Sequence, residues 1–96
     1  MEVFVDGRAC TTKEETHLYL KHVLNLPEYY GMNLDALYDC ISTMQHVKVY
    51  LIHWDVIVES LGEYGHQLLQ TLSEAAEENP GFELFMEDEL EDDVEI

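Results

Sequence analysis

The continuous apolar run in the middle of the chain places the strongest constraint on the fold. Residues 49–52 read Val-Tyr-Leu-Ile, inside the longer stretch VKVYLIHW at residues 47–54. A short β-branched and aromatic run of this kind is typical of a strand buried on both faces of a parallel sheet. Parallel strands are joined by long crossover connections that usually contain a helix. We therefore expect a central strand with helices before and after it in the sequence.

Two further strand patterns stand near the two ends of the chain. Residues 2–5, EVFV, are β-branched and aromatic and are closed by the turn dipeptide Asp6-Gly7. Residues 82–86, FELFM, have the same character. Three short strands separated by helical segments predict an α/β fold, a small three-stranded parallel sheet covered by about four helices with right-handed crossovers.

Capping residues set the expected helix limits. Thr12 and Glu15 form a capping box, in which each side chain accepts a hydrogen bond from a backbone N–H that the helix leaves unpaired. Asparagine and aspartate are also good N-caps, and glycine and proline end helices. We expect a helix over about residues 13–25, a second that follows Asn33 and fades near residue 44, a third between Asp55 and Gly62, and a fourth from about Gly65 to Asn79.

Three of these helices carry an apolar face at helical spacing. A chain of 96 residues, 47% hydrophobic, is long enough for one domain with a modest core. We expect a domain at residues 1–86 and an acidic, disordered tail at residues 87–96. The predicted core faces are Thr16, Leu20, Val23 and Leu24; Leu34, Leu37, Tyr38, Ile41 and Met44; and Leu68, Leu69, Leu72, Ala75 and Ala76.

Strong acidity excludes several classes of partner. The chain has 21 Asp and Glu against four Lys and Arg, a formal net charge of −17. Residues 87–96 hold seven of these acids, which leaves fourteen acids and four bases in residues 1–86. Scattered bases cannot cover a nucleic acid backbone or an anionic membrane. The tail also lacks the alternating acids and the glycine of a calcium-binding EF-hand loop.

Neither the cysteines nor the histidines form a recognisable reactive pattern. Cys10 and Cys40 lack metal-ligand spacing, and two cysteines are few for a secreted disulfide scaffold. The five histidines are scattered, and no phosphate loop, nucleophile elbow or zinc-protease motif is present. We expect no catalytic residue, cofactor or metal. The amino terminus has no export-signal pattern and no stretch is long enough for a membrane span, so we expect a cytoplasmic protein with both thiols reduced.

An acidic pair on the second expected helix is the best binding-site candidate. Asp35 and Asp39 are four residues apart, so they project side by side, and Ser42 shares their flank. The helix dipole partly compensates Asp35 in the first turn, whereas Asp39 has no basic neighbour in sequence. Tyr29 and Tyr30 stand just ahead of the helix, and aromatic residues beside charges are typical of interface centres. The alternative is an ordinary solvated helix face.

The same stretch carries a resemblance to a known family. Residues 26–40, LPEYYGMNLDALYDC, resemble the L-P-x-Y-Y-G-x-N-L-D-A-L-W-D-C run of the barstar family, the intracellular inhibitors of barnase-like secreted ribonucleases. The resemblance extends more loosely over about residues 1–86. It implies a three-stranded parallel sheet with four helices, in agreement with the periodicity, and no catalytic activity. By motif position it places the inhibitory face on Tyr29, Asp35 and Asp39, with Gly31, Asn33 and Tyr38 around them and Glu74 on the last helix.

The partner that these features predict is a basic ribonuclease or a related nuclease toxin, bound by a chain that is monomeric when free. Departures from the family pattern bear on which ribonuclease is recognised: Tyr38 replaces a tryptophan, and Thr43-Met44 replaces a glycine-tryptophan pair. The same acidity also suits a DNA mimic, an acidic adaptor, or the immunity protein of another nuclease toxin. A ribonuclease or toxin gene beside the gene for this chain would favour inhibition.

Overall fold

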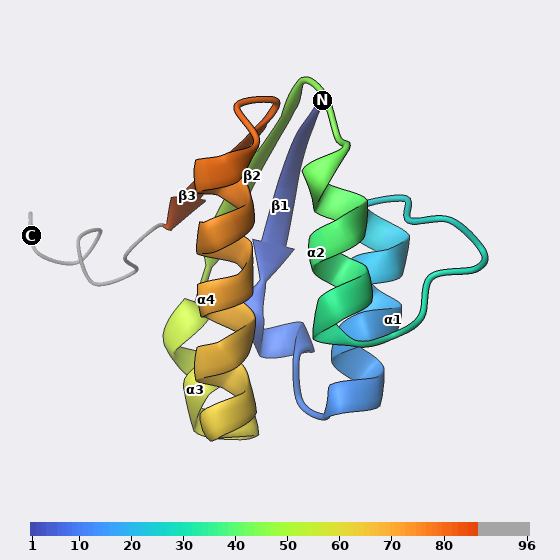
Figure 1. The fold of residues 1–96 in the computed structure, drawn as a ribbon. Coiled ribbons are helices and arrows are strands. Elements are labelled where there is room, and N and C mark those ends of the chain that lie inside the picture. The colour runs from blue at the N-terminus through green and yellow to red at the C-terminus, as the bar shows by residue number, and fades with distance from the viewer. Residues whose placement is uncertain (87–96) are drawn as a thin grey trace, which may run out of the picture.

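The computed structural model describes residues 1–86, and the predicted acidic tail at residues 87–96 lies outside the described residues. The chain forms a three-stranded parallel sheet and four α-helices, as predicted (Figure 1). In chain order the elements are β1 (Glu2–Asp6), the short 3-10 helix η1 (Gly7–Ala9), α1 (Lys13–Val23), α2 (Leu34–Ser42), β2 (Val47–Ile52), α3 (Trp54–Leu61), α4 (Glu63–Glu78) and β3 (Phe82–Met86).

The order of the strands determines where the helices lie. The sheet has the order β1-β2-β3, and Val3 pairs with Val49, which pairs with Leu84. Successive crossovers of one hand that step in the same direction place their helices on the same side of the sheet. Figure 1 shows α2 and α4 side by side in front of the strands. One face of the sheet is therefore packed, and the opposite face is open.

The prediction that the central strand is buried on both faces is wrong. Along β2 the side chains alternate: Val49 and Leu51 are buried, whereas Lys48 is exposed and Tyr50 is half-buried. The apolar run is continuous because the outward residue between Val49 and Leu51 is Tyr50, which belongs to a row of aromatic rings on the open face. The Tyr50 ring stacks on Phe4 with centroids 5.1 Å apart and on Phe85 at 5.2 Å. Such cross-strand aromatic pairs stabilise a sheet without a second helical layer.

The packed face of the sheet and the inner faces of the helices form one core. The predicted apolar faces are confirmed at their centres, because Leu20, Leu37 and Leu68 are all fully buried. Their margins, among them Val23 and Leu34, are only partly buried. The buried core consists of Val5, Cys10, Leu20, Leu24, Leu26, Tyr30, Leu37, Ile41, Val47, Val49, Leu51, Ile57, Leu68, Leu72, Ala75 and Phe82.

The first two helices begin at the caps that the sequence predicts. The Thr12 hydroxyl accepts a hydrogen bond from the Glu15 amide at 3.1 Å, and Asn33 accepts one from the Ala36 amide at 2.8 Å. The first helix ends at Val23 rather than near residue 25. Asn25 has a φ of 56°, in the left-handed region, which no α-helix continues through. The second helix ends at Ser42, two residues before the expected limit.

Asp55 does not cap the third helix. The helix begins one residue earlier, at Trp54, and the residue at the cap position is His53, with a φ of 53° and no side-chain cap bond. The chain turns at His53 directly from β2 into α3, so Asp55 falls in the first turn of the helix. A carboxylate at this position still interacts favourably with the positive end of the helix dipole. The limit of the central strand also shifts, because β2 ends at Ile52 and does not extend to residue 54.

The fourth helix begins at Glu63, two residues before the predicted start. Gly65 lies inside the helix and is buried. A Cβ at Gly65 would lie 2.6 Å from the Ile57 carbonyl oxygen, so glycine is needed because α4 crosses α3 closely at this point. With 16 residues α4 is the longest helix in residues 1–86, and none in that range is long and apolar enough to cross a membrane.

Candidate functional site

The segment that leads into α2 is held by the side chain of Asn33. Its Oδ1 atom accepts from the Ala36 amide, and its Nδ2 atom donates to the Gly31 carbonyl oxygen at 3.2 Å. A Cβ at Gly31 would lie 3.3 Å from the Cβ of Ala36, so the loop runs close to the first turn of the helix. Asn33 and Gly31, both candidate site residues, therefore set the position of the loop relative to the helix.

Helix α2 presents its two acids to solvent. Asp35 and Asp39 are exposed, while Leu37 and Ile41 on the opposite side are fully buried. Ser42 is also exposed, and its hydroxyl donates to the Asp39 carbonyl oxygen at 2.7 Å, within the last turn. The structure thus places both carboxylates of the predicted pair on the outer surface of one short, firmly packed helix.

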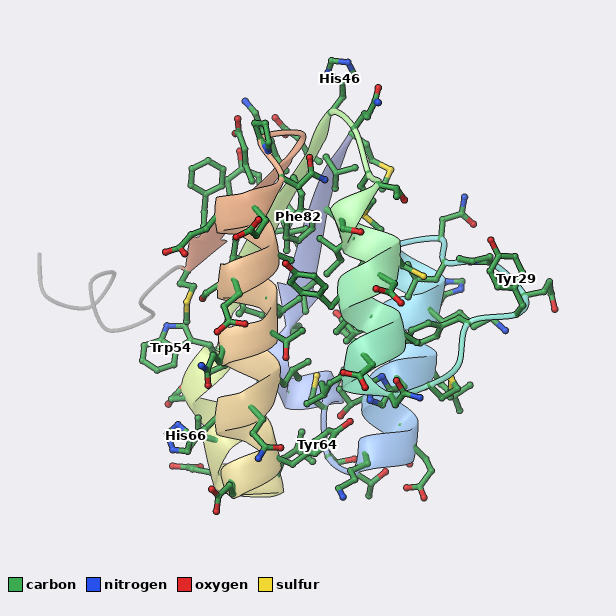
Figure 2. The ribbon with its side chains drawn as sticks, in the orientation of Figure 1. Tyr29, His46, Trp54, Tyr64, His66 and Phe82 are labelled. Carbon is green, nitrogen blue, oxygen red and sulfur yellow. The ribbon has the colours of Figure 1, made fainter. Side chains whose placement is uncertain are left out.

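The other candidate residues lie on neighbouring elements. Tyr29 extends from the loop between α1 and α2 with 87% of its surface exposed (Figure 2). Tyr38 is half-buried on α2 itself. Glu74 is exposed on α4, which packs against α2, and its carboxylate accepts a hydrogen bond from the side-chain Nε2 of Gln70 at 3.0 Å. Tyr29, α2 and Glu74 therefore belong to adjacent parts of the fold.

The acids of this face have no positively charged partner in the described part of the chain. Among residues 1–86 the one ion pair within 4 Å joins Arg8 to Asp6 at 2.8 Å. The carboxylates of Asp35 and Asp39 therefore rely on water for solvation, and that of Glu74 relies on water and on its hydrogen bond from Gln70. A partner that displaced this water would have to supply cations in its place, since an unpaired buried charge is costly.

A buried histidine fixes the loop that carries Tyr29. The two ring nitrogens of His17 lie 2.6 Å from the hydroxyls of Tyr30 and Tyr64, so α1, the loop and α4 are joined in one network. His17 is 1% exposed, and burial lowers its pKa. Burial also raises the pKa of both tyrosines, so their hydroxyls stay protonated.

Sequence reasoning missed this role of His17. The available signal was its position beside Thr16 on the inward face of α1, one turn before Leu20. Both ring nitrogens already have partners, so the histidine acts as an internal support. Within residues 1–86, no three side chains of His, Cys, Asp or Glu gather as a metal site.

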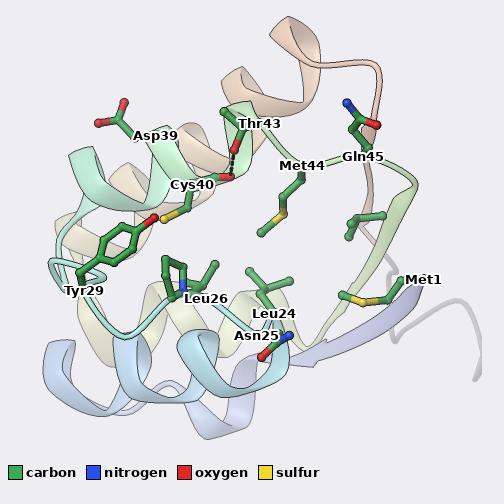
Figure 3. Close-up of a pocket in the computed structure, with 12 residues that line it drawn as sticks. Met1, Leu24, Asn25, Leu26, Tyr29, Asp39, Cys40, Thr43, Met44 and Gln45 are labelled. Atoms are coloured by element: carbon green, nitrogen blue, oxygen red, sulfur yellow. Dashed lines mark hydrogen bonds between the residues drawn. The ribbon is translucent and has the colours of Figure 1, made fainter.

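A hollow of about 700 Å³ beside the acidic pair was not predicted either (Figure 3). It lies between the loop that follows α1, the second half of α2 and the first residue of the chain. Asp39 and Tyr29 stand at its edge, and Met44 contributes to its wall. Sequence patterns give no signal for it because its walls come from three separated segments.

The two cysteines are free thiols, as predicted. Cys10 is buried in the core and Cys40 is half-buried on α2. Desolvation raises the pKa of both thiols, and the nearby Asp39 carboxylate adds to the effect at Cys40. Since the thiolate is the reactive form, neither cysteine is an activated nucleophile.

Replacing both cysteines with alanine is expected to leave folding and partner binding intact. The expected cost is packing only, about 1–3 kcal/mol in the free energy of unfolding and mostly from Cys10, because Cys40 is partly exposed. Urea unfolding of the single variants Cys10→Ala and Cys40→Ala measures how much each substitution lowers the free energy of unfolding. Intact-mass measurement on freshly lysed cells provides the control, since a mass two protons lower than the reduced chain would show a disulfide.

Comparison with known proteins agrees with this architecture. The small parallel sheet with its helices on one face defines an α/β domain with an acidic helix as its candidate site. The family described as Barstar (barnase inhibitor) matches residues 1–89, so the chain belongs to the barstar family. It is also 35% identical over 79 residues to "Putative ribonuclease inhibitor YrdF" of Bacillus subtilis (strain 168), which covers 80% of this chain and 87% of that protein.

Proposed function

We propose that this protein is an inhibitor of a basic, barnase-like secreted ribonuclease. The observation that carries the proposal is the exposed acidic pair Asp35 and Asp39, which has no ion-pair partner within residues 1–86 and stands beside the exposed Tyr29. Family membership and the name of the Bacillus subtilis relative support the same role. The protein acts by binding and performs no reaction of its own.

The mechanism follows from charge complementarity. A ribonuclease active site gathers Arg, Lys and His side chains that hold the phosphates of RNA. Carboxylates on α2 occupy the positions of those phosphates and form charge-assisted hydrogen bonds with the same cations. Because α2 is packed through Leu37 and Ile41, the carboxylates are presented on a rigid element, which reduces the entropic cost of binding. Tyr29 covers the edge of the contact and excludes water.

The remaining candidate residues have supporting roles in this proposal. Asn33 and Gly31 hold the loop, and Ser42 closes the last turn of α2. Tyr38, half-buried on the same helix one turn after Asp35, adds an aromatic ring beside the acids. Glu74 offers a further carboxylate from α4 to a second cation of the enzyme. The inhibitor acts in the cytoplasm, where free thiols persist and where a ribonuclease made for export has to be kept inactive.

Inhibition of purified enzymes tests the proposal. Several basic, barnase-like secreted ribonucleases are titrated with the full chain while cleavage of a fluorogenic RNA is followed. We expect stoichiometric inhibition of at least one enzyme and its loss in the Asp35→Ala/Asp39→Ala variant. The matched control is Asp55→Ala/Glu59→Ala, an exposed acid pair at the same spacing on α3. Equal loss in both variants would contradict a site on α2.

A parallel titration of basic deoxyribonucleases separates the alternatives. Inhibition of a deoxyribonuclease with no effect on any ribonuclease would favour an immunity protein for another toxin. Absence of inhibition in both sets would favour the acidic adaptor.

Removing residues 87–96 is expected to slow association with the ribonuclease and leave dissociation nearly unchanged. The segment carries seven acids, and long-range charge acts mainly on the rate of encounter. Surface plasmon resonance at low and moderate salt measures both rates, and the difference between full-length and truncated chains should shrink as salt rises. A large increase in dissociation rate on truncation would instead place the segment in the interface.

A further inference from the structure

The interior of the hollow beside Asp39 is lined by apolar side chains of the core. Its floor is formed by Leu24, Leu26 and Val47, each less than 8% exposed and each part of the core. Met44 and Met1 line its far side, and Figure 3 shows both side chains directed toward the centre. The space is therefore a recess between core elements that opens to the surface.

Met1 is held in place at the edge of this recess. Its backbone nitrogen donates to the His46 carbonyl oxygen at 2.7 Å, and its carbonyl oxygen accepts from the Lys48 amide at 2.8 Å. The opposite edge is formed by Cys40 on α2, whose carbonyl oxygen accepts from the Thr43 hydroxyl at 3.2 Å (Figure 3). Both edges are thus fixed by hydrogen bonds, while the thioethers between them adapt to what they contact.

Two charged groups stand at the hollow, on opposite edges. Asp39 is the one lining residue with a charged side chain, and it stands at the rim on the α2 side, whereas the terminal ammonium group of Met1 is bonded to the His46 carbonyl oxygen. The remaining polar lining, such as Asn25 and Gln45, is neutral. An occupant is therefore apolar toward Met44 and positively charged, or attached to a positive group, toward Asp39.

We propose that the hollow is a specificity pocket, which receives an apolar side chain of the partner next to the cation that pairs with Asp39. This inference rests on the proposed function, because the same docking that covers Asp39 brings the partner over the hollow. The pocket makes this chain select among basic partners: all of them can satisfy the acids, and only one with a large apolar residue in the right place fills the recess.

A second copy of the chain fits the hollow less well. Residues 1–86 carry fourteen acids and four bases, so two copies repel each other, and neither would bring a clustered positive group to Asp39. The volume of the hollow also falls in the range of small-molecule pockets, about 300–1,000 Å³. However, its position beside the exposed α2 face and its opening to the surface favour a side chain presented by a protein.

The first experiment tests the pocket without a ribonuclease. The four methionines are labelled with ¹³C at the methyl group, and the full chain is titrated with phenethylammonium, a benzene ring on a cationic stem, and separately with ethylammonium, the cation alone. We expect saturable shifts of the Met1 and Met44 signals with phenethylammonium only, weakened by Asp39→Ala. Met86, exposed at the end of β3, is the internal control. Equal shifts at Met86, or none at Met1 and Met44, would overturn the proposal.

The second experiment fills the pocket. Met44→Trp occupies the hollow, Met44→Ala removes one wall, and Met86→Trp is the matched control on an exposed methionine. Against a ribonuclease that the wild type inhibits, we expect dissociation of both Met44 variants to be about tenfold faster and that of Met86→Trp to be unchanged, as expected for the loss of a well-packed interfacial side chain. Thermal unfolding confirms that each variant is folded.

The outcomes separate this inference from the proposed function. Methionine shifts with phenethylammonium, without inhibition of any ribonuclease, would support the pocket and refute the inhibitor role. Inhibition that depends on Asp39, with wild-type rates in both Met44 variants, would support the inhibitor role and overturn the pocket. Met1 and Met44 shifts that follow protein concentration, with a doubled mass in sedimentation, would show a second copy as the occupant and also overturn it.

Discussion

Asp39→Ala is expected to weaken binding to the cognate ribonuclease by about 2–5 kcal/mol, mostly through faster dissociation, which is the general range for removing one partner of a buried charge pair at an interface. Asp39 lies at the middle of the exposed α2 flank and at the rim of the hollow, where a docked enzyme excludes the most water. Its loss leaves a cation of the enzyme buried and unpaired. Surface plasmon resonance measures both rates.

Other substitutions on this face are expected to weaken binding by smaller amounts. Asp35→Ala and Tyr29→Ala should come next, and Glu74→Ala should matter less because it lies on the neighbouring helix. The matched control is Glu59→Ala, an exposed acid on α3. Relieving the like-charge pair should leave the melting temperature of Asp39→Ala equal to or slightly above that of the wild type. Wild-type binding by a folded Asp39→Ala protein would refute the helix-face model and favour the adaptor.

His17→Ala is expected to lower the free energy of unfolding by about 2–5 kcal/mol. The substitution leaves a cavity and also removes the partner of two hydroxyls, those of Tyr30 and Tyr64, which lie 2.6 Å from the ring nitrogens. Urea denaturation measures the loss. Because the network fixes the loop that carries Tyr29, association with the ribonuclease should also slow, whereas a loss below about 0.5 kcal/mol would show that the network adds little stability.

The same histidine makes stability fall in acid. Burial holds the pKa of His17 below its ordinary value of about 6.5, so above that pH both folded and unfolded chains are neutral at this site. As the pH falls below about 6.5, the unfolded chain takes up a proton that the folded chain does not, and stability drops until the lowered pKa is reached. Urea denaturation at pH 7.5 and at pH 5.5 should therefore give a smaller free energy of unfolding at the lower pH.

His17→Gln isolates this effect if the alanine variant does not fold. Glutamine keeps hydrogen-bonding groups near the two tyrosines and does not titrate, so the loss of stability between pH 7.5 and 5.5 should become smaller. His66→Gln is the matched control, because His66 is an exposed histidine on α4 (Figure 2). An unchanged pH profile in His17→Gln would show that another group is responsible.

Local sequence signals predicted the elements well and their limits less well. Thr12 and Asn33 cap the first two helices because a side-chain oxygen accepts from an amide a few residues away, which depends on local sequence alone. At the third helix, Asp55 is the strongest capping residue in the local sequence, but the helix begins after a turn at His53 instead. The hydrophobic contacts of α3 with the rest of the fold outweigh one capping bond, and such contacts are not visible in the local sequence.

For the candidate site, too, the local sequence predicted some features and left others open. The spacing of Asp35 and Asp39 predicted that they share one flank, because α-helical geometry fixes the direction of side chains four residues apart. Their exposure followed from the burial of Leu37 and Ile41 on the other side. Their use in binding stays a prediction, as does the part played by Glu74.

The sequence by itself determined the three strands, the four helices and the acidic α2 flank, since each depends on residues close together in the chain. The helical segment between each pair of strands further predicted that the strands pair in parallel. The tertiary structure alone decided which face of the sheet stays open, how His17 joins Tyr30 to Tyr64, and where the hollow beside Met44 forms. Each of these depends on contacts between segments that are far apart in sequence. Their placement follows from the direction in which the crossovers step across the sheet, which no local pattern encodes.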